Sequence, residues 1–176
     1  NQARPKDGAT LLYVAAEKVH VDVVIALLEH KADPNQETTD DGQTPLYAAS
    51  YEGHVEVATA LLEHNANPNQ AMTDDGTTPL CIAARNGKAE CLKLLLEKNA
   101  NPNLAMTDNG STPLYLAAQE GRAKCLKLLL EHKANPNQAR TDNGSTPVSI
   151  STGQGRAKCL KLLLEHKANP NQARTD

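Results

Sequence analysis

A period of 34 residues constrains this chain more than any other feature of its sequence. The tripeptide Thr-Pro-Leu at 44–46 recurs at 78–80 and 112–114, and a Thr-Pro-Val variant follows at 146–148. A second motif, Ala-(Asn/Asp)-Pro-Asn, recurs five times at the same interval. Self-similarity at a fixed period of this length is typical of repeat proteins, in which each unit is one supersecondary element stacked on the next.

The two ends of the chain fall at the same point of the repeat, because residues 171–176 continue in phase with residues 1–6. Residues 121–142 and 155–176 are identical. We interpret the chain as a segment of a longer array, in which either recent duplication or deliberate construction explains the identical stretch. The unequal repeats and the free cysteines favour a natural origin.

Composition excludes several classes of protein. The net charge is −3, which is not basic enough to indicate a nucleic-acid or membrane-surface protein. Aromatic residues make up 2% of the chain, all of them tyrosine, so we expect a core of aliphatic residues and no large aromatic cofactor pocket. No apolar run approaches the roughly 18 residues that span a bilayer.

The cysteines follow the repeat. Cys91, Cys125 and Cys159 are each 34 residues apart within leucine-rich stretches, and Cys81 precedes them. This spacing indicates one repeated core position, not a disulfide framework or a catalytic nucleophile. Free thiols predict a reducing intracellular compartment, and specifically the cytoplasm.

One unit of the repeat predicts two helices and a loop. Thr44, followed by proline, is typical of a helix N-terminus, and Gly53 permits the left-handed turn that ends this first helix. A second helix over residues 54–64 carries an apolar stripe at helical spacing. Asn65 is the next best residue to glycine for a positive φ, and residues 69–77 supply the turn of a hairpin-like finger.

The whole unit resembles the ankyrin repeat. It contains Asp-Gly-x-Thr-Pro-Leu-x-x-Ala-Ala, then glycine, then a leucine-rich helix and Ala-Asn-Pro-Asn, in four or five successive copies. The tetratricopeptide repeat shares the 34-residue period but needs Trp and Phe, which the chain lacks. The unit departs from the usual ankyrin pattern by one extra loop residue between Asn69 and Gly76. The usual histidine after Thr-Pro-Leu is also replaced, by Tyr47, Cys81, Tyr115 and Ser149.

The resemblance implies an all-α ankyrin-repeat solenoid of stacked antiparallel helix pairs with hairpin-like finger loops. It covers one domain, residues 1–176, with repeats at 1–34, 35–68, 69–102, 103–136 and 137–170 and a partial loop at 171–176. In the last repeat Leu160, Leu162, Leu163 and Leu164 stay apolar where a dedicated cap is polar, so we expect an exposed apolar end. Self-association through uncapped end repeats follows as one partner prediction.

Two columns of polar residues have ordinary structural interpretations. His30, His64, His132 and His166 recur one period apart, and equivalent residues of stacked helices lie roughly 8–10 Å apart, too far to share a metal ion. Lys93, Lys127 and Lys161 each precede a glutamate by four residues, which favours a solvated outer face over a basic patch for an acidic partner. We expect no metal and no cofactor.

Charge is unevenly distributed along the repeats. Residues 35–68 carry six acidic and no basic residues, whereas residues 137–170 carry five basic and two acidic residues. Such polarity suits a charged partner or head-to-tail packing. Chance divergence explains it equally well.

Some positions differ between otherwise similar repeats. In the family that the chain resembles, these positions form a concave face that binds partners. At the finger they begin with Arg4 and Thr38, and after the finger glycine they include Ala9 and Ser145. The predicted partner-binding residues are Gln43, Tyr51, Glu52, Met72, Thr77, Arg85, Asn86, Met106, Ser111, Gln119, Glu120 and Arg140. Within this set we favour the stretch formed by Tyr51, Met72, Arg85 and Met106, since exposed Met, Tyr and Arg are enriched at interfaces.

The leading hypothesis is a non-enzymatic module that binds another protein, and neither nucleic acid nor membrane. A phosphate-binding loop, a metal-ligand cluster and a nucleophile–base pair are all absent from the sequence pattern. Two alternatives stay open: a substrate-targeting segment of a larger multidomain or effector enzyme, and a structural or self-associating scaffold, natural or engineered.

Overall fold

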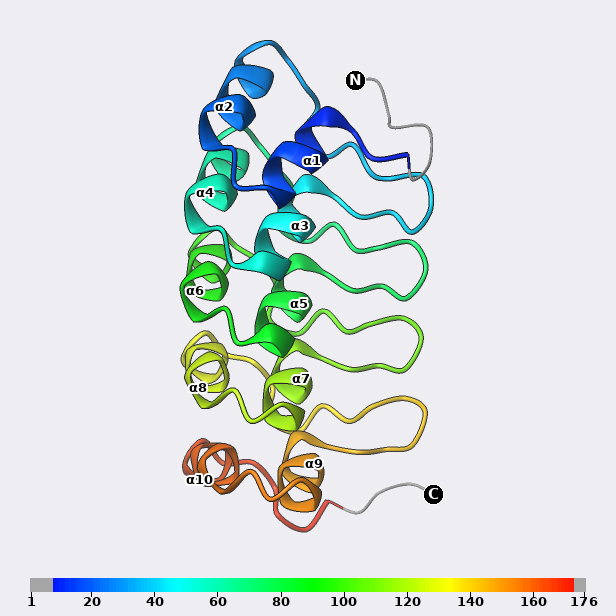
Figure 1. The fold of residues 1–176 in the computed structure, drawn as a ribbon. Helices are drawn as coiled ribbons and strands as arrows, with labels where there is room; N and C mark the ends of the chain where they lie inside the picture. The colour runs from blue at the N-terminus through cyan, green and yellow to red at the C-terminus, as the bar shows by residue number, and fades with distance from the viewer. Residues whose placement is uncertain (1–7, 173–176) are drawn as a thin grey trace.

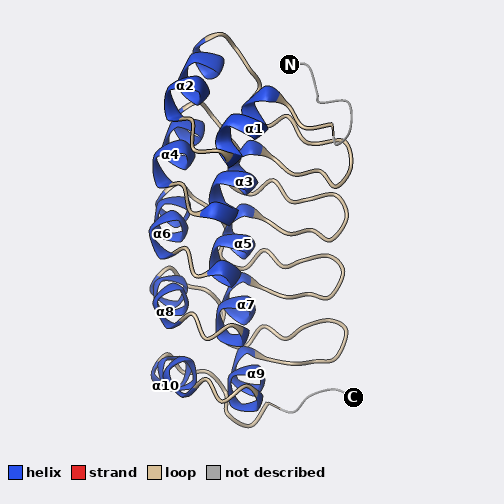
Figure 2. Ribbon diagram, viewed as in Figure 1, coloured by secondary structure: helices blue, strands red, loops and turns tan. Residues whose placement is uncertain are grey.

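A computed structural model describes residues 8–172 of the chain as ten helices connected by loops, with no strand in this range (Figures 1 and 2). The helices are α1 (Leu11–Glu17), α2 (Val21–Glu29), α3 (Pro45–Glu52), α4 (Val55–Glu63), α5 (Pro79–Asn86), α6 (Ala89–Glu97), α7 (Pro113–Gln119), α8 (Ala123–Glu131), α9 (Pro147–Gly153) and α10 (Ala157–Glu165). Each 34-residue unit therefore supplies two short helices, as its sequence predicts.

The helices form two parallel rows. The odd-numbered helices stack as an inner row and the even-numbered helices as an outer row, and each odd helix packs against the even helix that follows it (Figure 1). Long finger loops project from the inner row on the side away from the outer helices (Figure 1). One pair alone cannot bury its apolar stripe, so each pair is stabilised by its neighbours.

The predicted caps of the inner helices are confirmed. The Thr44 hydroxyl accepts a hydrogen bond of 3.1 Å from the Tyr47 N–H, and Thr10, Thr78, Thr112 and Thr146 cap the other four inner helices in the same way. Proline occupies the first turn of α3, α5, α7 and α9, where its missing N–H has no intrahelical partner to lose.

The turn between the two helices of a unit requires a left-handed residue. Gly53 has φ +83°, a conformation that residues with a side chain rarely adopt, so the glycine is needed for its conformation. Val19 occupies the same position in the first unit with φ +62°, a strained conformation for a β-branched residue. The positive φ predicted for Asn65 is confirmed at +66°.

The core consists of columns of leucine and small residues between successive units. Leu61, Leu95, Leu129 and Leu163 are one period apart and fully buried. Alanine at 49, 83 and 117 is equally buried on the inner helices and lets neighbouring helices approach closely. All four cysteines are buried and free, which confirms their interpretation as core residues.

Asparagine side chains connect each unit to the next. The Asn69 side chain accepts a hydrogen bond of 2.7 Å from the Asn101 N–H and donates one of 3.3 Å to the Asn99 carbonyl. Asn35 and Asn103 repeat both contacts. The recurrence of Ala-Asn-Pro-Asn therefore reflects a ladder of polar contacts between repeats, which the sequence alone did not reveal.

The fingers are held both internally and to each other. Within the third finger the Met72 N–H donates to the Thr77 carbonyl at 2.9 Å, and between fingers the Thr107 N–H donates to the Asp75 carbonyl at 2.8 Å. A Cβ on Gly76 would lie 2.6 Å from the Thr107 nitrogen, which explains the finger glycine. Through these hydrogen bonds, successive fingers form a continuous layer beside the inner helices.

Apolar side chains are exposed at both ends of the described stack. Leu164 of α10 is 44% exposed, which confirms that part of the predicted apolar end. Leu163 is fully buried, however, because it faces back toward the preceding unit and not outward. Leu11, Val19 and Val23 are exposed at the other end.

Candidate functional site

The predicted partner-binding surface comprises the fingers and the inner helices α1, α3, α5, α7 and α9, and we call it the concave surface. Nine of the twelve predicted partner-binding residues have at least part of their surface accessible. These nine are Gln43, Tyr51, Glu52, Met72, Arg85, Asn86, Gln119, Glu120 and Arg140. Tyr51 is the most exposed of the tyrosines, at 47%.

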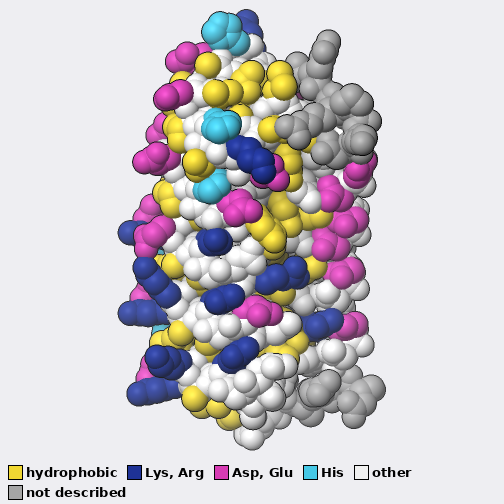
Figure 3. Space-filling view, in the orientation of Figure 1, with side chains coloured by type: hydrophobic (Ala, Val, Ile, Leu, Met, Phe, Trp, Pro, Cys, Tyr) yellow, Lys and Arg dark blue, Asp and Glu magenta, His cyan; other side chains and the backbone are white. Residues whose placement is uncertain are grey.

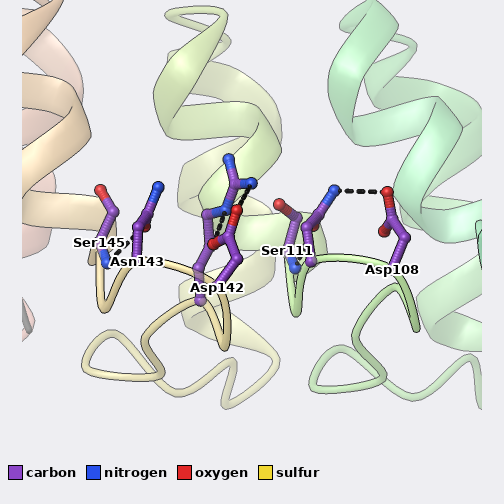
Figure 4. A network of polar contacts seen from close by, with 7 residues as sticks. Asp108, Ser111, Asp142, Asn143 and Ser145 are labelled. Atoms are coloured by element: carbon purple, nitrogen blue, oxygen red, sulfur yellow. Dashed lines mark hydrogen bonds and ion pairs between the residues drawn. The ribbon is translucent and has the colours of Figure 1, made fainter. Parts of the chain in front are cut away.

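Three predicted binding residues are buried, so the prediction that they are exposed is wrong. Thr77 and Ser111 lie at the base of their fingers, where their N–H groups donate to the Asp75 and Asn109 side chains at 2.8 Å. Figure 4 shows Ser111 in this position. Met106 is only 4% exposed, because it packs with Cys81 and Leu116. Thr38, Ala9 and Ser145 are also buried, and Arg4 lies outside the described residues.

Met106 is covered by a neighbouring predicted site residue. The Arg85 guanidinium lies 3.7 Å from the Met106 sulfur. Arg85 is half-buried and its carbonyl accepts a hydrogen bond of 3.1 Å from the Arg122 Nε. The middle of the concave surface therefore presents Arg85, while Met106 contributes to packing beneath it.

A cavity of about 300 Å³ lies between the first two inner helices, and we call it the N-terminal cavity. It is lined by Tyr13, Glu17, Gln43, Tyr47, Ala48, Tyr51 and Glu52. The Tyr47 and Tyr51 ring centroids are 6.4 Å apart, and the Tyr13 hydroxyl donates to the Gln43 side chain. An adjoining hollow of about 370 Å³ shares Tyr13, Glu17 and Gln43 and extends to Asp40 and Asp41.

The electrostatic environment of Tyr47 is predominantly negative. Burial, followed by the negative charges of Asp75 and Asp41, raises the pKa of Tyr47 to about 12, although the positive charge of Arg85 opposes this shift. The hydroxyl therefore keeps its proton at neutral pH and is able to donate a hydrogen bond to a ligand.

A cavity of about 360 Å³, which we call the C-terminal cavity, occupies the same place in the repeat between α7 and α9. It is lined by Tyr115, Gln119, Arg140, Asn143, Ser145, Ser149, Ile150, Gly153 and Gln154. The Arg140 guanidinium carbon lies 5.4 Å from the Tyr115 ring centroid. The Arg140 Nε donates a hydrogen bond of 2.9 Å to the Asp142 carboxylate (Figure 4). This cavity therefore contains a cation supplied by the chain itself.

The histidine and lysine columns have the structural roles expected of them. His64 Nδ1 lies 2.9 Å from the Ala60 carbonyl at the end of α4, and His30, His132 and His166 make the same contact with their own helices. Residues 8–172 contain no group of three His, Cys, Asp or Glu side chains placed to hold a metal ion. The exposed pairs of Lys93 with Glu97 and Lys127 with Glu131 span 3.7 and 3.8 Å.

The sequence analysis missed a role for the residues that begin the outer helices. The Nε atoms of Arg122 and Arg156 donate to the carbonyls of Arg85 and Gln119 at 3.1 and 3.2 Å. Each arginine thus binds a carbonyl near the end of the inner helix of the preceding unit, α5 or α7, where positive charge is favoured. The 34-residue recurrence of a long basic side chain is the signal that points to this contact.

The described cysteines are poor candidates for nucleophiles. Burial raises the pKa of the Cys91 and Cys125 thiols to about 11, and it raises the pKa of Cys81 and Cys159 as well. At neutral pH these thiols are therefore protonated and enclosed by the core.

Charge on the surface follows the gradient seen in the sequence. Lys and Arg side chains gather over α8 and α10, whereas Asp, Glu and His are more frequent toward α2 and α4 (Figure 3). The N-terminal cavity therefore lies in the more acidic part of the molecule.

The stacked helix pairs, the capped inner helices and the paired fingers define a class of protein. A family model for ankyrin repeats, in three copies, matches residues 1–72, 69–140 and 100–174. The chain belongs to the ankyrin repeat family, whose members are generally protein–protein interaction modules and typically non-enzymatic.

Two further observations accompany this assignment. A comparison with curated proteins finds no match to the chain. Within residues 8–172, no helix has the length and apolar character needed to cross a bilayer.

Proposed function

We propose that the protein binds another protein through the concave surface formed by its fingers and inner helices. The observation that carries this proposal is the contrast between the two faces of the stack. The outer helices α6, α8 and α10 repeat almost the same residues, with Lys93, Lys127 and Lys161 each four residues before a glutamate, whereas α2 and α4 differ from them. The concave surface instead differs from unit to unit and contains the tyrosine-lined N-terminal cavity.

The chemistry of the concave surface supports a protein partner. Tyr51 is exposed beside the half-buried Arg85 and Asn86, and tyrosine and arginine are the residue types that most often dominate interface energies. The Asn86 side chain donates to the Tyr51 carbonyl at 3.2 Å, which fixes one part of this surface before a partner arrives. A preorganised surface loses less conformational entropy on binding.

Site-specific photo-crosslinking tests the proposal. A crosslinking amino acid is placed at Tyr51 or Asn86 on the concave surface, and in matched controls at Lys93 or Lys127 on the outer helices. The proposal predicts that proteins from the cells that express this chain crosslink at 51 and 86 but not at 93 and 127. A captured protein is then purified and its affinity measured, and equal capture from both faces contradicts the proposal.

A second candidate function is self-assembly through the ends of the stack. Leu164 at one end and Leu11 at the other expose apolar surface that stacked repeats normally cover. Light scattering over a wide concentration range tests it. Growth in mass that Leu164→Glu removes supports end-to-end packing, and a constant monomer mass rules it out.

The proposal extends to the cellular setting. Four buried free thiols suit a reducing intracellular compartment, where disulfides do not form. A role as the targeting segment of a larger enzyme is compatible with the same concave surface, since it requires only that the bound protein be a substrate.

A further inference from the structure

The N-terminal and C-terminal cavities are equivalent places in the repeat, because their lining residues correspond three periods apart. Tyr13 corresponds to Tyr115, and the other pairs are Glu17 with Gln119, Gln43 with Ser145, Tyr47 with Ser149, Ala48 with Ile150, Tyr51 with Gly153 and Glu52 with Gln154. The two cavities thus share a backbone framework and one tyrosine but differ in most other side chains.

The C-terminal cavity shows how this framework holds a guanidinium group. Arg140 lies over the Tyr115 ring at 5.4 Å, within the range of a cation–π interaction, and its Nε donates to the Asp142 carboxylate at 2.9 Å. A second hydrogen bond joins the Arg140 guanidinium to the other oxygen of the same carboxylate. Apart from Arg140, the side chains that line this cavity are neutral.

The N-terminal cavity has the opposite charge. In the adjoining hollow, Thr38 stands at the position of Arg140, and Asp40 stands at the position of its carboxylate partner Asp142. Glu17 and Glu52 replace two glutamines, and none of the residues that line this cavity is basic. Acidic side chains therefore line the N-terminal cavity and the adjoining hollow, whereas the equivalent place in the other cavity holds an arginine.

Aromatic surface completes the N-terminal cavity. Three of the four tyrosines of the chain, Tyr13, Tyr47 and Tyr51, line it. The faces of aromatic rings attract cations, and arginine in particular stacks on them through its planar guanidinium. Lys18 is the one basic residue of the adjoining hollow, and its exposed amine is paired with Glu17 at 3.1 Å.

We propose that the N-terminal cavity binds an arginine side chain from an extended segment of the partner protein. The guanidinium stacks on the tyrosine rings and donates to the carboxylates of Glu17, Glu52 or Asp40, as Arg140 does with Tyr115 and Asp142. The proposal rests on the proposed function, because it names the chemistry of the partner at one part of the concave surface.

The surrounding charge favours the same ligand. Residues 35–68, which provide Tyr47, Tyr51 and Glu52, carry six acidic side chains and no basic one. This field attracts a basic peptide and repels a phosphate-bearing ligand, and its attraction weakens as salt is added.

The test uses capped pentapeptides in which a single arginine, lysine or citrulline is flanked by glycine and serine. Citrulline has nearly the shape of arginine but no charge. The full chain is labelled with ¹³C on its tyrosine rings, and peptide titrations are followed by NMR. We expect the arginine peptide to shift the rings of Tyr47 and Tyr51 and to leave Tyr115 unchanged, with the citrulline peptide binding at least fivefold more weakly.

Three variants locate the binding. Tyr51→Leu removes an exposed ring and is expected to lower the affinity for the arginine peptide about fivefold. The double variant Glu17→Gln and Glu52→Gln is expected to lower this affinity by a similar factor. The affinity of the double variant should also depend less on salt concentration. Thr38→Arg places an arginine where Arg140 stands in the other cavity and is expected to abolish binding. The control Lys127→Met, on the outer helix α8, leaves binding unchanged.

Several results would overturn the inference: equal affinity for citrulline, equal affinity for lysine, shifts confined to Tyr115, or full binding by the double glutamine variant. Failure here is distinguishable from failure of the proposed function. If crosslinking from position 51 still captures a partner while the arginine peptide does not bind, the concave surface binds proteins by other chemistry. If the peptide binds but crosslinking occurs only on the outer face, the cavity binds arginine but the concave surface does not bind the partner.

Discussion

The interior of the stack and its concave surface share one period, yet equivalent positions behave differently in the two regions. In the interior, the column from Leu61 to Leu163 repeats the same residue with complete burial. On the concave surface, the column from Glu17 to Gly153 passes through Tyr51, Arg85 and Gln119. The comparison teaches that packing fixes the residues between units and leaves the concave positions free to acquire binding chemistry.

The identical stretches 121–142 and 155–176 give the sharpest test of what packing contributes. Leu130 and Leu164 have the same sequence neighbours, but Leu130 is 7% exposed and Leu164 is 44% exposed. We expect Leu130→Ala to lower the free energy of unfolding by about 3 kcal/mol and Leu164→Ala by less than about 1 kcal/mol. Urea denaturation of both variants measures the difference, and equal losses would contradict the assignment of Leu164 to an uncovered end.

On the concave surface, two methionines one period apart differ in burial, so they can be used to distinguish a packing role from a binding role. Met106 is buried beneath Arg85, whereas Met72, one period earlier, is only partly buried. Met106→Ala is expected to cost about 2 kcal/mol of stability, and Met72→Ala about 0.5 kcal/mol. Thermal and urea unfolding provide the measurement, and a Met72 variant as unstable as the Met106 variant would remove Met72 from the accessible surface.

The buried thiols of the interior predict a dependence of stability on pH. Burial raises the pKa of Cys91 and Cys125 from an ordinary value of 9.0 to about 11, so the folded state holds these protons more tightly than the unfolded state. Their contribution is complete below pH 9 and is lost as the pH rises toward 11. The expected loss at pH 11 is about 2 kcal/mol for each thiol.

Urea titrations at a series of pH values measure this loss. The double variant Cys91→Ala and Cys125→Ala serves as the control and should show a shallower decline between pH 9 and 11. An identical decline in the control would assign the effect to other groups.

The smallest effect concerns one irregular turn. Val19 has φ +62° where the later units have glycine, so Val19→Gly removes strain of roughly 1 kcal/mol. We expect this variant to be more stable by about that amount, and the reciprocal Gly53→Val to be less stable because a β-branched residue is strained at φ +83°. Denaturation midpoints measure both, and a destabilised Val19→Gly variant would show that its side chain packs usefully.

Much of the fold was predictable from the sequence because it depends on local chemistry. The caps at Thr44 and its equivalents, the left-handed Gly53 and the stop at Asn65 each follow from one residue and its immediate neighbours. The apolar columns were equally clear, since the repeat places the same residue at the same position in each unit.

The features that sequence reasoning missed depend on contacts between units. Met106 was predicted to be exposed, and its burial arises from packing with Leu116 and with Cys81 and Arg85 of the preceding unit. Asn69 and Arg122 were not assigned a role, because their partners are carbonyls and N–H groups of neighbouring units. The N-terminal cavity likewise joins Tyr13 to Tyr51 across two units.

The most direct test measures stability and binding on the same variant. The unfolding free energy of Tyr51→Leu and its affinity for the partner captured at position 51 are compared with those of the unmodified chain. If the interior supports packing and the concave surface supports binding, Tyr51→Leu should bind the partner about fivefold more weakly. Its unfolding free energy should stay unchanged within about 0.5 kcal/mol. Equal loss of stability and binding, or unchanged affinity, would contradict the separation of packing from binding on which the account depends.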